Sequence, residues 1–253
     1  APCVYRVHDR PSVEKIESFY NKARASKVIE IIEPNYIYSI QKTANDKQFK
    51  NLWGLKNLKT IGIDIGAEKA WDTTTGSKNI VVAVVDSGVD INHPDLKANI
   101  WVNKTELHGT AGIDDDGNGF VDDAGGWDFV TNSPLIQDHA GHGTHVAGII
   151  AGAHSDETAG SANYVQGIAP SAKLLPLAFL DEGGSGSMLN GVKAIQYAVK
   201  RGAKVINASW GGAGCSRSLK EAIAGLEAQG VIFVAAAGND SMNIDRSPMY
   251  PAS

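Results

Sequence analysis

Three segments of the sequence carry side chains that together can catalyse acyl transfer. Asp86 follows the apolar, β-branched run at 80–85, so a carboxylate stands at the end of an expected buried strand. His142 lies in a Gly-His-Gly-Thr-His motif that runs into small apolar residues, as at the start of a helix. Asn239 ends the segment Val-Ala-Ala-Ala-Gly-Asn. An acid, an imidazole and a carboxamide are the groups that orient a base, move a proton and stabilise an oxyanion.

Each of these residues also fits an ordinary structural role when it is taken alone. Asp86 suits a solvated loop, His142 a satisfied structural histidine, and Asn239 a turn. Zinc binding by His139, His142 and His145 is disfavoured, because steps of three residues spread the side chains around a helix and the glutamate of the zinc-protease motif is missing. No glycine fingerprint for a dinucleotide follows the strand at 80–85, so a nucleotide site is discarded.

Composition excludes two classes of partner. The 253 residues hold 28 acidic and 23 basic side chains, a net charge of −5, so the basic surface that binds nucleic acid is absent. No apolar run approaches the roughly 20 residues that span a bilayer. We therefore expect neither a nucleic-acid partner nor a membrane-spanning segment.

The order of the expected elements indicates an α/β fold. Strands and helices alternate along the second half of the chain, which is typical of a parallel sheet with right-handed crossovers. In such sheets sites form at the carboxyl ends of the strands. The expected strands are 80–85, 173–180, 204–207 and 231–236, and the expected helices are 188–201 and one through Leu219, Ile223 and Leu226.

The first 40 residues have a different pattern. A strand at 4–8, a helix from Ser12 and a strand at 27–32 are expected, and an extended stretch follows at 36–38. A unit this short cannot bury a sufficient core alone, so it should pack on something else. Residues 41–60 are polar and resemble a connector.

An aspartate-rich loop predicts a calcium site. Five aspartates fall in the ten positions from 114 to 123, and crowded carboxylates repel one another unless a cation lies among them. Acidic or amide residues occupy the first, third and fifth places and glycine the sixth, as at the start of a calcium loop, although Gly125 replaces the usual twelfth-position glutamate. A solvated acidic turn is the alternative. The expected ligands are Asp114, Asp116, Asn118, the Phe120 carbonyl and Asp123.

Together the motifs resemble the subtilisin-like serine protease family. Asp86 matches the aspartate of its Asp-Ser/Thr-Gly motif, His142 the first histidine of its His-Gly-Thr-His motif, and Asn239 its oxyanion asparagine. The resemblance runs from about Trp53 to the last residue. It implies a three-layer fold with a central parallel sheet and peptide hydrolysis through an Asp-His-Ser triad. It also implies secretion, and it makes Asp95 a further calcium ligand.

The resemblance further implies a groove for a polypeptide substrate. In the family an extended peptide pairs its backbone between two segments, as an added β-strand would. Small residues at the primary specificity pocket leave room for a large side chain. The implied substrate-binding residues are Gly184, Ser185, Gly186, Ser209, Trp210, Gly211, Ala236, Ala237 and Gly238.

The two ends of the sequence suggest how this chain relates to a full enzyme. Residues 1–42 resemble the second half of the family's inhibitory propeptide, and 43–253 resemble the catalytic domain. The propeptide is therefore an expected partner of the catalytic part. No serine here lies in a Gly-Thr-Ser-Met-Ala context, so we expect this chain alone to be inactive. The alternative is a non-catalytic, calcium-dependent peptide-binding pseudoprotease.

Overall fold

The computed structural model describes residues 21–22, 35–40, 53–55, 57, 60, 62–153 and 166–253. The strand and helix expected near the N-terminus and the strand expected at 27–32 lie outside the described residues, apart from residues 21–22. Most of the polar connector expected at 41–60 also lies outside them.

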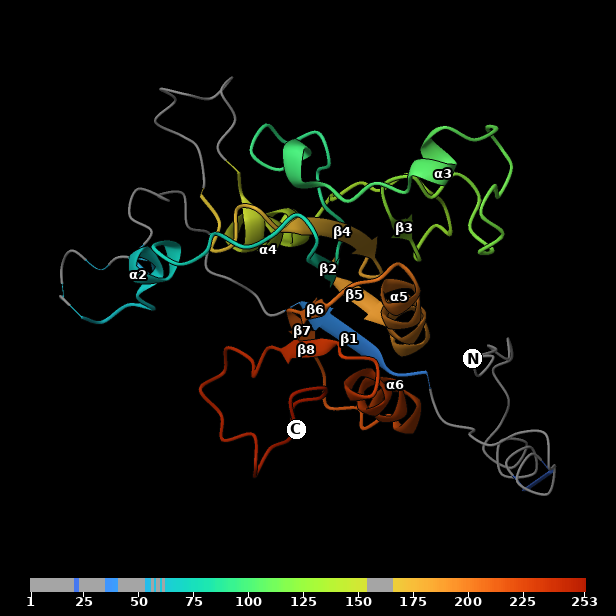
Figure 1. Ribbon diagram of the computed structural model, residues 1–253. Helices are drawn as coiled ribbons and strands as arrows, with labels where there is room; N and C mark the ends of the chain where they lie inside the picture. Colours follow the sequence, from blue (N-terminus) through green and yellow to red (C-terminus); the bar gives the residue numbers. More distant parts are fainter. Residues whose placement is uncertain are drawn as a thin grey trace.

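A five-stranded parallel sheet forms the centre of the molecule (Figure 1). Its order is β3-β4-β2-β6-β8, and each neighbouring pair is parallel. This confirms the α/β fold with a central parallel sheet. The strands are β2 (Val81–Asp86), β3 (Trp127–Asp128), β4 (Lys173–Ala178), β6 (Val205–Ala208) and β8 (Ile232–Ala235).

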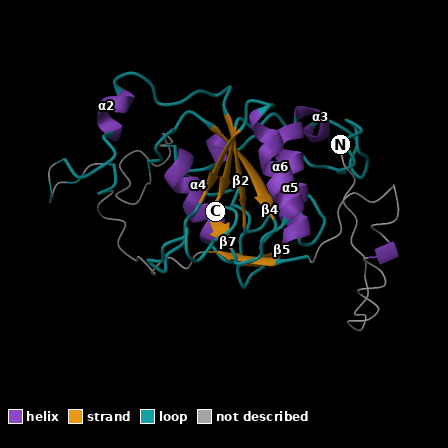
Figure 2. Cartoon of the chain, turned by 90° about the horizontal axis from the view of Figure 1, so that it is seen from below, coloured by secondary structure: helices purple, strands orange, loops and turns teal. Residues whose placement is uncertain are grey.

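Helices cover both faces of this sheet, which gives three layers (Figure 2). Helix α4 (His142–Ala151) lies on one face, and α5 (Met188–Lys200) and α6 (Arg217–Glu227) lie on the other. The apolar run of β2 explains the arrangement. Its alternate side chains enter two separate cores, Val82 and Val84 with α4 and Ala83 and Val85 with α5.

The helices on the second face begin where the sequence supplies hydrogen-bond acceptors. Ser187 precedes α5 and its side chain accepts from the Asn190 N–H, and Ser216 does the same for the Leu219 N–H before α6. Three short helices lie outside the layers: α2 (Ala67–Trp71), the 3-10 helix η1 (Lys97–Asn99) and α3 (Lys104–Leu107). None of the helices in the described part is long and apolar enough to cross a membrane.

A second, three-stranded sheet lies at one end of the central sheet. It consists of β5 (Ser185–Ser187), β1 (Ile37–Ile40) and β7 (Trp210–Gly211), and β1 is the middle strand (Figure 1). Both pairings are antiparallel, with Tyr38 opposite Gly186 and Ser39 opposite Gly211. Residues 37–40 therefore pair with strands from the second half of the chain.

Candidate active site

A buried contact joins the carboxyl end of β2 to the first residue of α4. Asp86 is the last residue of β2 and is fully buried, and His142 is the first residue of α4 and is 8% exposed. The Asp86 Oδ1 and His142 Nδ1 atoms lie 2.7 Å apart. This leaves the Nε2 atom of the imidazole for a further partner, which is the arrangement of an oriented general base.

Glycines allow β2 and α4 to approach closely enough for this contact. Gly141 precedes the helix in a left-handed conformation (φ 74°), which turns the chain into the first helical turn. A β-carbon on Gly143 would lie 2.0 Å from the Gly88 carbonyl oxygen and 3.1 Å from the Asp86 β-carbon. The Gly-His-Gly pattern is therefore a packing requirement as well as a motif.

Neighbouring groups hold the Asp86 carboxylate and the strand that carries it. The Ser87 N–H donates to Asp86 Oδ1 at 2.8 Å. The Trp210 indole donates to the Val85 carbonyl at 2.8 Å, which ties β7 to β2 beside the site. Among the described residues, nothing donates a hydrogen bond to the buried Asp86 Oδ2 atom.

The electrostatics of the pair favour a positively charged imidazole. Burial alone lowers the pKa of His142. The hydrogen bond and charge of Asp86, together with the charge of Asp138, outweigh this effect and raise the His142 pKa above its ordinary value of 6.5. These two carboxylates therefore stabilise the imidazolium that forms when His142 takes up a proton.

Asn239 follows β8, and the end of β8 lies at the same edge of the sheet as Asp86. Strands β2, β6 and β8 are adjacent and parallel, so their carboxyl ends share one edge. Asn239 is exposed, four residues after β8 ends. Ser209 follows β6 at the same edge, and its hydroxyl accepts a hydrogen bond from the Asn207 side chain at 2.9 Å.

The two expected walls of the substrate groove flank strand β1. Gly184 comes just before β5, which contains Ser185 and Gly186, and β7 contains Trp210 and Gly211. The backbone of β1 pairs with both, so an extended segment lies between them as a third strand. The space between β5 and β7, where the sequence predicts a substrate groove, is thus filled by β1 of the same chain.

The side chain of Tyr38 anchors β1 in this position. Tyr38 is fully buried, and its hydroxyl donates to the Gly214 carbonyl at 2.9 Å. Its ring packs on Trp210, with ring centroids 5.3 Å apart. Trp210 itself is fully buried between Tyr38 and Phe179.

A cavity of about 520 Å³ lies next to β7 and the segment after β8. Ala237 and Gly238 line it, and Met249 lies close to Gly211 at its side. Ser209, Trp210, Gly211 and Ala236 are not lining residues. The remaining lining residues are Ala213, Cys215, Asp240, Met242, Ile244, Ser247, Pro248 and Tyr250.

Comparison with known protein families decides the membership of this chain. A family model described as the subtilase family, peptidase S8, matches residues 77–253, which is more than half of the chain. The chain belongs to the subtilase family. Subtilases are serine peptidases, and the α/β fold with its parallel sheet is consistent with this membership.

Relatives of this subtilase occur in Plasmodium, Bacillus and Thermoactinomyces. Subtilisin-like protease 1 of Plasmodium berghei (strain Anka) is 36% identical over 204 residues, covering 80% of this chain and 32% of the relative. The thermophilic serine proteinase of Bacillus sp. (strain AK1) is 32% identical over 237 residues, covering 93% and 50%. Thermitase of Thermoactinomyces vulgaris is 37% identical over 188 residues, covering 74% and 56%. The chain thus spans about a third to just over half of these relatives' lengths.

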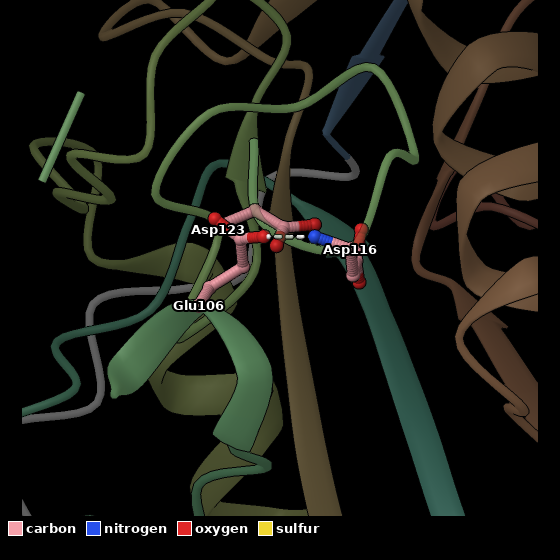
Figure 3. Close-up of side chains that lie close together, drawn as sticks. All are labelled: Glu106, Asp116 and Asp123. Atoms are coloured by element: carbon pink, nitrogen blue, oxygen red, sulfur yellow. Dashed lines mark hydrogen bonds between the residues drawn. The ribbon is translucent and has the colours of Figure 1, made fainter. Parts of the chain in front are cut away.

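The aspartate-rich loop of this subtilase brings three carboxylates together. The carboxylate oxygens of Glu106, Asp116 and Asp123 lie within 4.8 Å of one another, and the three side chains converge in Figure 3. Calcium binds oxygen ligands at 2.3–2.6 Å, so two ligands on opposite sides of one ion are about 4.8 Å apart. An all-oxygen donor set at this spacing fits calcium.

Glu106 was not among the ligands expected from the sequence. It lies in α3, is 6% exposed and accepts from the Asp116 and Asp122 N–H groups, each at 3.0 Å. It therefore holds both sides of the loop. A glutamate eight residues before the first aspartate of the loop carries no motif spacing, and only the first turn of a short helix brings it back to the aspartates.

The other expected ligands take different positions in the loop. Asp114 accepts hydrogen bonds from the Asn118 and Gly119 N–H groups, which closes the turn. The Asn118 side chain donates to Asp123 at 3.0 Å. The Phe120 ring packs edge-on against Trp127 and Tyr197 and anchors the loop in the core.

Two of the clustered carboxylates respond differently to their surroundings. Burial raises the pKa of Asp123, and hydrogen bonds from Tyr197 and Asn103 offset this only in part. For Asp116 burial also acts upward, but hydrogen bonds from Asn103 and Arg201 bring its pKa below the ordinary value. Arg201 contacts Asp116 at 2.5 Å, so the residue that follows α5 supplies positive charge to the cluster.

Asp95, the further expected calcium ligand, is not in the cluster of Glu106, Asp116 and Asp123. Its side chain is buried, with 3% exposure. Its main-chain carbonyl accepts from the Ala153 N–H at 2.7 Å. Residues 154–165, which follow that contact, lie outside the described residues.

Proposed function

We propose that the full-length protein is a serine endopeptidase that acts through an Asp86–His142–serine triad. The observation that carries the proposal is the buried 2.7 Å contact between Asp86 Oδ1 and His142 Nδ1 at the carboxyl edge of the sheet. It is supported by the match to a family of serine peptidases. No serine of these 253 residues lies in a Gly-Thr-Ser-Met-Ala context, and we propose that the longer protein supplies the nucleophile.

Each residue of the proposed site has one chemical task. His142 takes the proton of the serine hydroxyl as the serine attacks the peptide carbonyl, and it later gives that proton to the leaving amine. Asp86 keeps the proton of the neutral imidazole on Nδ1 and stabilises the imidazolium that forms. The Asn239 carboxamide donates to the oxyanion of the tetrahedral intermediate.

The proposed substrate is a polypeptide bound in extended form between β5 and β7. Strand β1 supports this proposal, because it makes the antiparallel pairing that a substrate backbone would make. We propose that residues 1–42 are part of an inhibitory propeptide and that β1 blocks the groove as a substrate mimic. The 520 Å³ cavity beside Gly238 would take a large apolar side chain of the substrate.

We also propose that calcium is the cofactor, held by Glu106, Asp116 and Asp123. A bound cation would neutralise the repulsion among these carboxylates. It would so stabilise the loop and helix α3, which carries Glu106. Secretion is proposed on the family resemblance, and extracellular calcium concentrations suit weak loop sites of this kind.

Covalent labelling of full-length protein tests the proposed activity. A fluorophosphonate probe, which reacts with an activated serine, should label wild-type protein, and a quenched peptide substrate should be cleaved. His142→Ala should abolish both, whereas the exposed His108→Ala should change neither. Peptide binding without labelling or cleavage would contradict the proposal and favour the peptide-binding pseudoprotease. The 253-residue chain alone should not be labelled.

A further inference from the structure

Asp138, which no motif singles out, makes four hydrogen bonds beside the Asp86–His142 pair. Its Oδ1 atom accepts from the Gly141 N–H and the Ser87 hydroxyl, both at 2.8 Å. Its Oδ2 atom accepts from the Thr144 N–H at 2.7 Å and from the Thr144 hydroxyl at 2.6 Å. Both oxygens of one carboxylate are therefore committed to the segment that carries His142.

These bonds supply acceptors for main-chain N–H groups at the start of α4. The first N–H groups of a helix have no partners within it, and the residue before the helix usually supplies a side-chain acceptor. In α4 that residue is Gly141, which has no side chain and makes no such bond. Asp138 supplies the missing acceptor from three residues earlier, and its negative charge suits the positive end of the helix.

The same carboxylate is also linked to Asp86. The Ser87 hydroxyl lies 2.8 Å from Asp138 Oδ1 and 3.2 Å from Asp86 Oδ1, and it accepts from the Gly143 N–H at 3.0 Å. Because one hydroxyl has one proton, the shorter distance assigns that proton to Asp138. Ser87 thus joins the end of β2, the first turn of α4 and Asp138.

We propose that Asp138 is a positioning residue for peptide hydrolysis: it holds the first turn of α4 so that the His142 imidazole faces Asp86, and its charge assists the imidazolium formed during turnover. The inference rests on the proposed function of the Asp86–His142 pair. Asp138 acts through the helix and through Ser87, and it does not itself touch the reacting atoms.

The charges around His142 support a role beyond holding the backbone. Within the described residues, the charges that act on its ring belong to Asp86, from β2, and Asp138, from the segment before α4. Both raise the His142 pKa. A residue with a purely structural role could be replaced by a neutral acceptor without changing the protonation of the imidazole.

Substitution in the full-length protein tests the proposal. Asp138→Asn keeps the shape and removes the charge, so the acid limb of the kcat/KM profile should move to lower pH. We expect kcat to fall about tenfold with KM nearly unchanged, because the imidazole is displaced while the groove is intact. Asp138→Glu, which keeps the charge, should retain the wild-type acid limb. An unchanged acid limb in Asp138→Asn would overturn the proposal.

Asp128→Asn is the matched control. Asp128 also accepts from two main-chain N–H groups and a threonine hydroxyl, those of Val130 and Thr131, but its charge does not act on His142. It should lose stability and keep the wild-type acid limb. A shift as large as that of Asp138→Asn would refute a specific role for Asp138.

Two further variants keep the outcomes distinct. If Asp138→Asn does not fold, Thr144→Val removes one of the four bonds, together with the bond from the Asp90 N–H to the same hydroxyl, and leaves the carboxylate. A lower kcat at unchanged KM then supports the proposal, and a wild-type kcat overturns it.

Asp86→Asn tests the proposed function itself. Loss of activity there with a wild-type profile in Asp138→Asn would reject the positioning role alone, whereas wild-type activity in Asp86→Asn would reject the triad.

Discussion

Gly143 and Gly88 lie so close that a β-carbon on Gly143 would come within 2.0 Å of the Gly88 carbonyl oxygen. Because Gly143 directly follows His142 in the first turn of α4, Gly143→Ala must push that turn away from β2. We expect a loss of about 2 kcal/mol or more in the free energy of unfolding, as in overpacked cores, together with loss of peptidase activity in full-length protein. Thermal unfolding and peptide cleavage measure the two effects.

The glycine of α6 provides the control for this substitution. Gly225 lies in a helix as Gly143 does, but a β-carbon there would meet no atom within 4 Å. Gly225→Ala should therefore raise stability, by up to about 1 kcal/mol, because alanine favours the helix. Equal losses in both variants would show that close packing of α4 on β2 is not the cause.

The raised pKa of His142 predicts opposite pH dependences for stability and activity. A group whose pKa is higher in the folded state stabilises the fold below its unfolded pKa, near 6.5, and loses this effect as pH rises through the folded value. The excess stability of wild type over His142→Ala should thus decline as pH rises above about 6.5. Peptidase activity, which needs the neutral imidazole, should rise over the same interval.

Paired measurements across pH 5–9 check this prediction. Denaturant unfolding of wild type and His142→Ala gives the stability difference, and kcat/KM of full-length protein gives the activity. A stability difference that grows with pH above 6.5 would contradict the direction of the shift.

Removal of calcium should lower the melting temperature. Without a cation, Glu106, Asp116 and Asp123 repel one another. Chelation with EDTA should therefore lower Tm, and added calcium should restore it by mass action. Glu106→Gln should reduce calcium affinity measured by calorimetry, whereas the exposed Asp72→Asn should leave it unchanged. A calcium response of Glu106→Gln equal to that of wild type would exclude Glu106 as a ligand.

Loss of the Tyr38 side chain should release β1 from its position between β5 and β7. Tyr38→Ala removes a fully buried ring and a hydrogen bond to Gly214, at a cost of about 3–5 kcal/mol. We expect faster hydrogen exchange of the Gly186 amide in this variant, since Gly186 pairs with Tyr38. Tyr38→Phe should cost only about 1 kcal/mol and keep most of the protection. Unchanged exchange in Tyr38→Ala would show that the ring does not anchor the strand.

The sequence predicted the central sheet and its helices well because both have strong local patterns. The apolar run ending at Asp86 is buried on both faces of β2, and the stripe from Leu189 to Val199 lies in α5. The ends of both elements lie within one residue of the expected bounds. The order of strands and helices then implied parallel pairing. The small apolar residues after His142 pointed correctly to a helix that begins there.

The remaining features depend on contacts between distant residues. Nothing near Glu106 signals that its carboxylate faces Asp116 and Asp123, and Asp138 looks like an ordinary loop residue until Ser87 and Thr144 are placed around it. The family resemblance implied that the segment with Trp210 binds substrate, but no sequence pattern showed where its ring lies. In the structure the ring is buried, because an indole in the core gains apolar contacts and can still donate to a carbonyl.

Strand β1 and the two strands that enclose it belong to one polypeptide, and this tether has a kinetic and thermodynamic consequence. A segment joined to its own binding site faces that site at an effective concentration of about millimolar or higher. If a free peptide binds between β5 and β7 as proposed, it must compete with β1, even when its intrinsic affinity is the same. A backbone cut after Ile40 would remove the advantage of β1, because the released segment could then dissociate and be diluted.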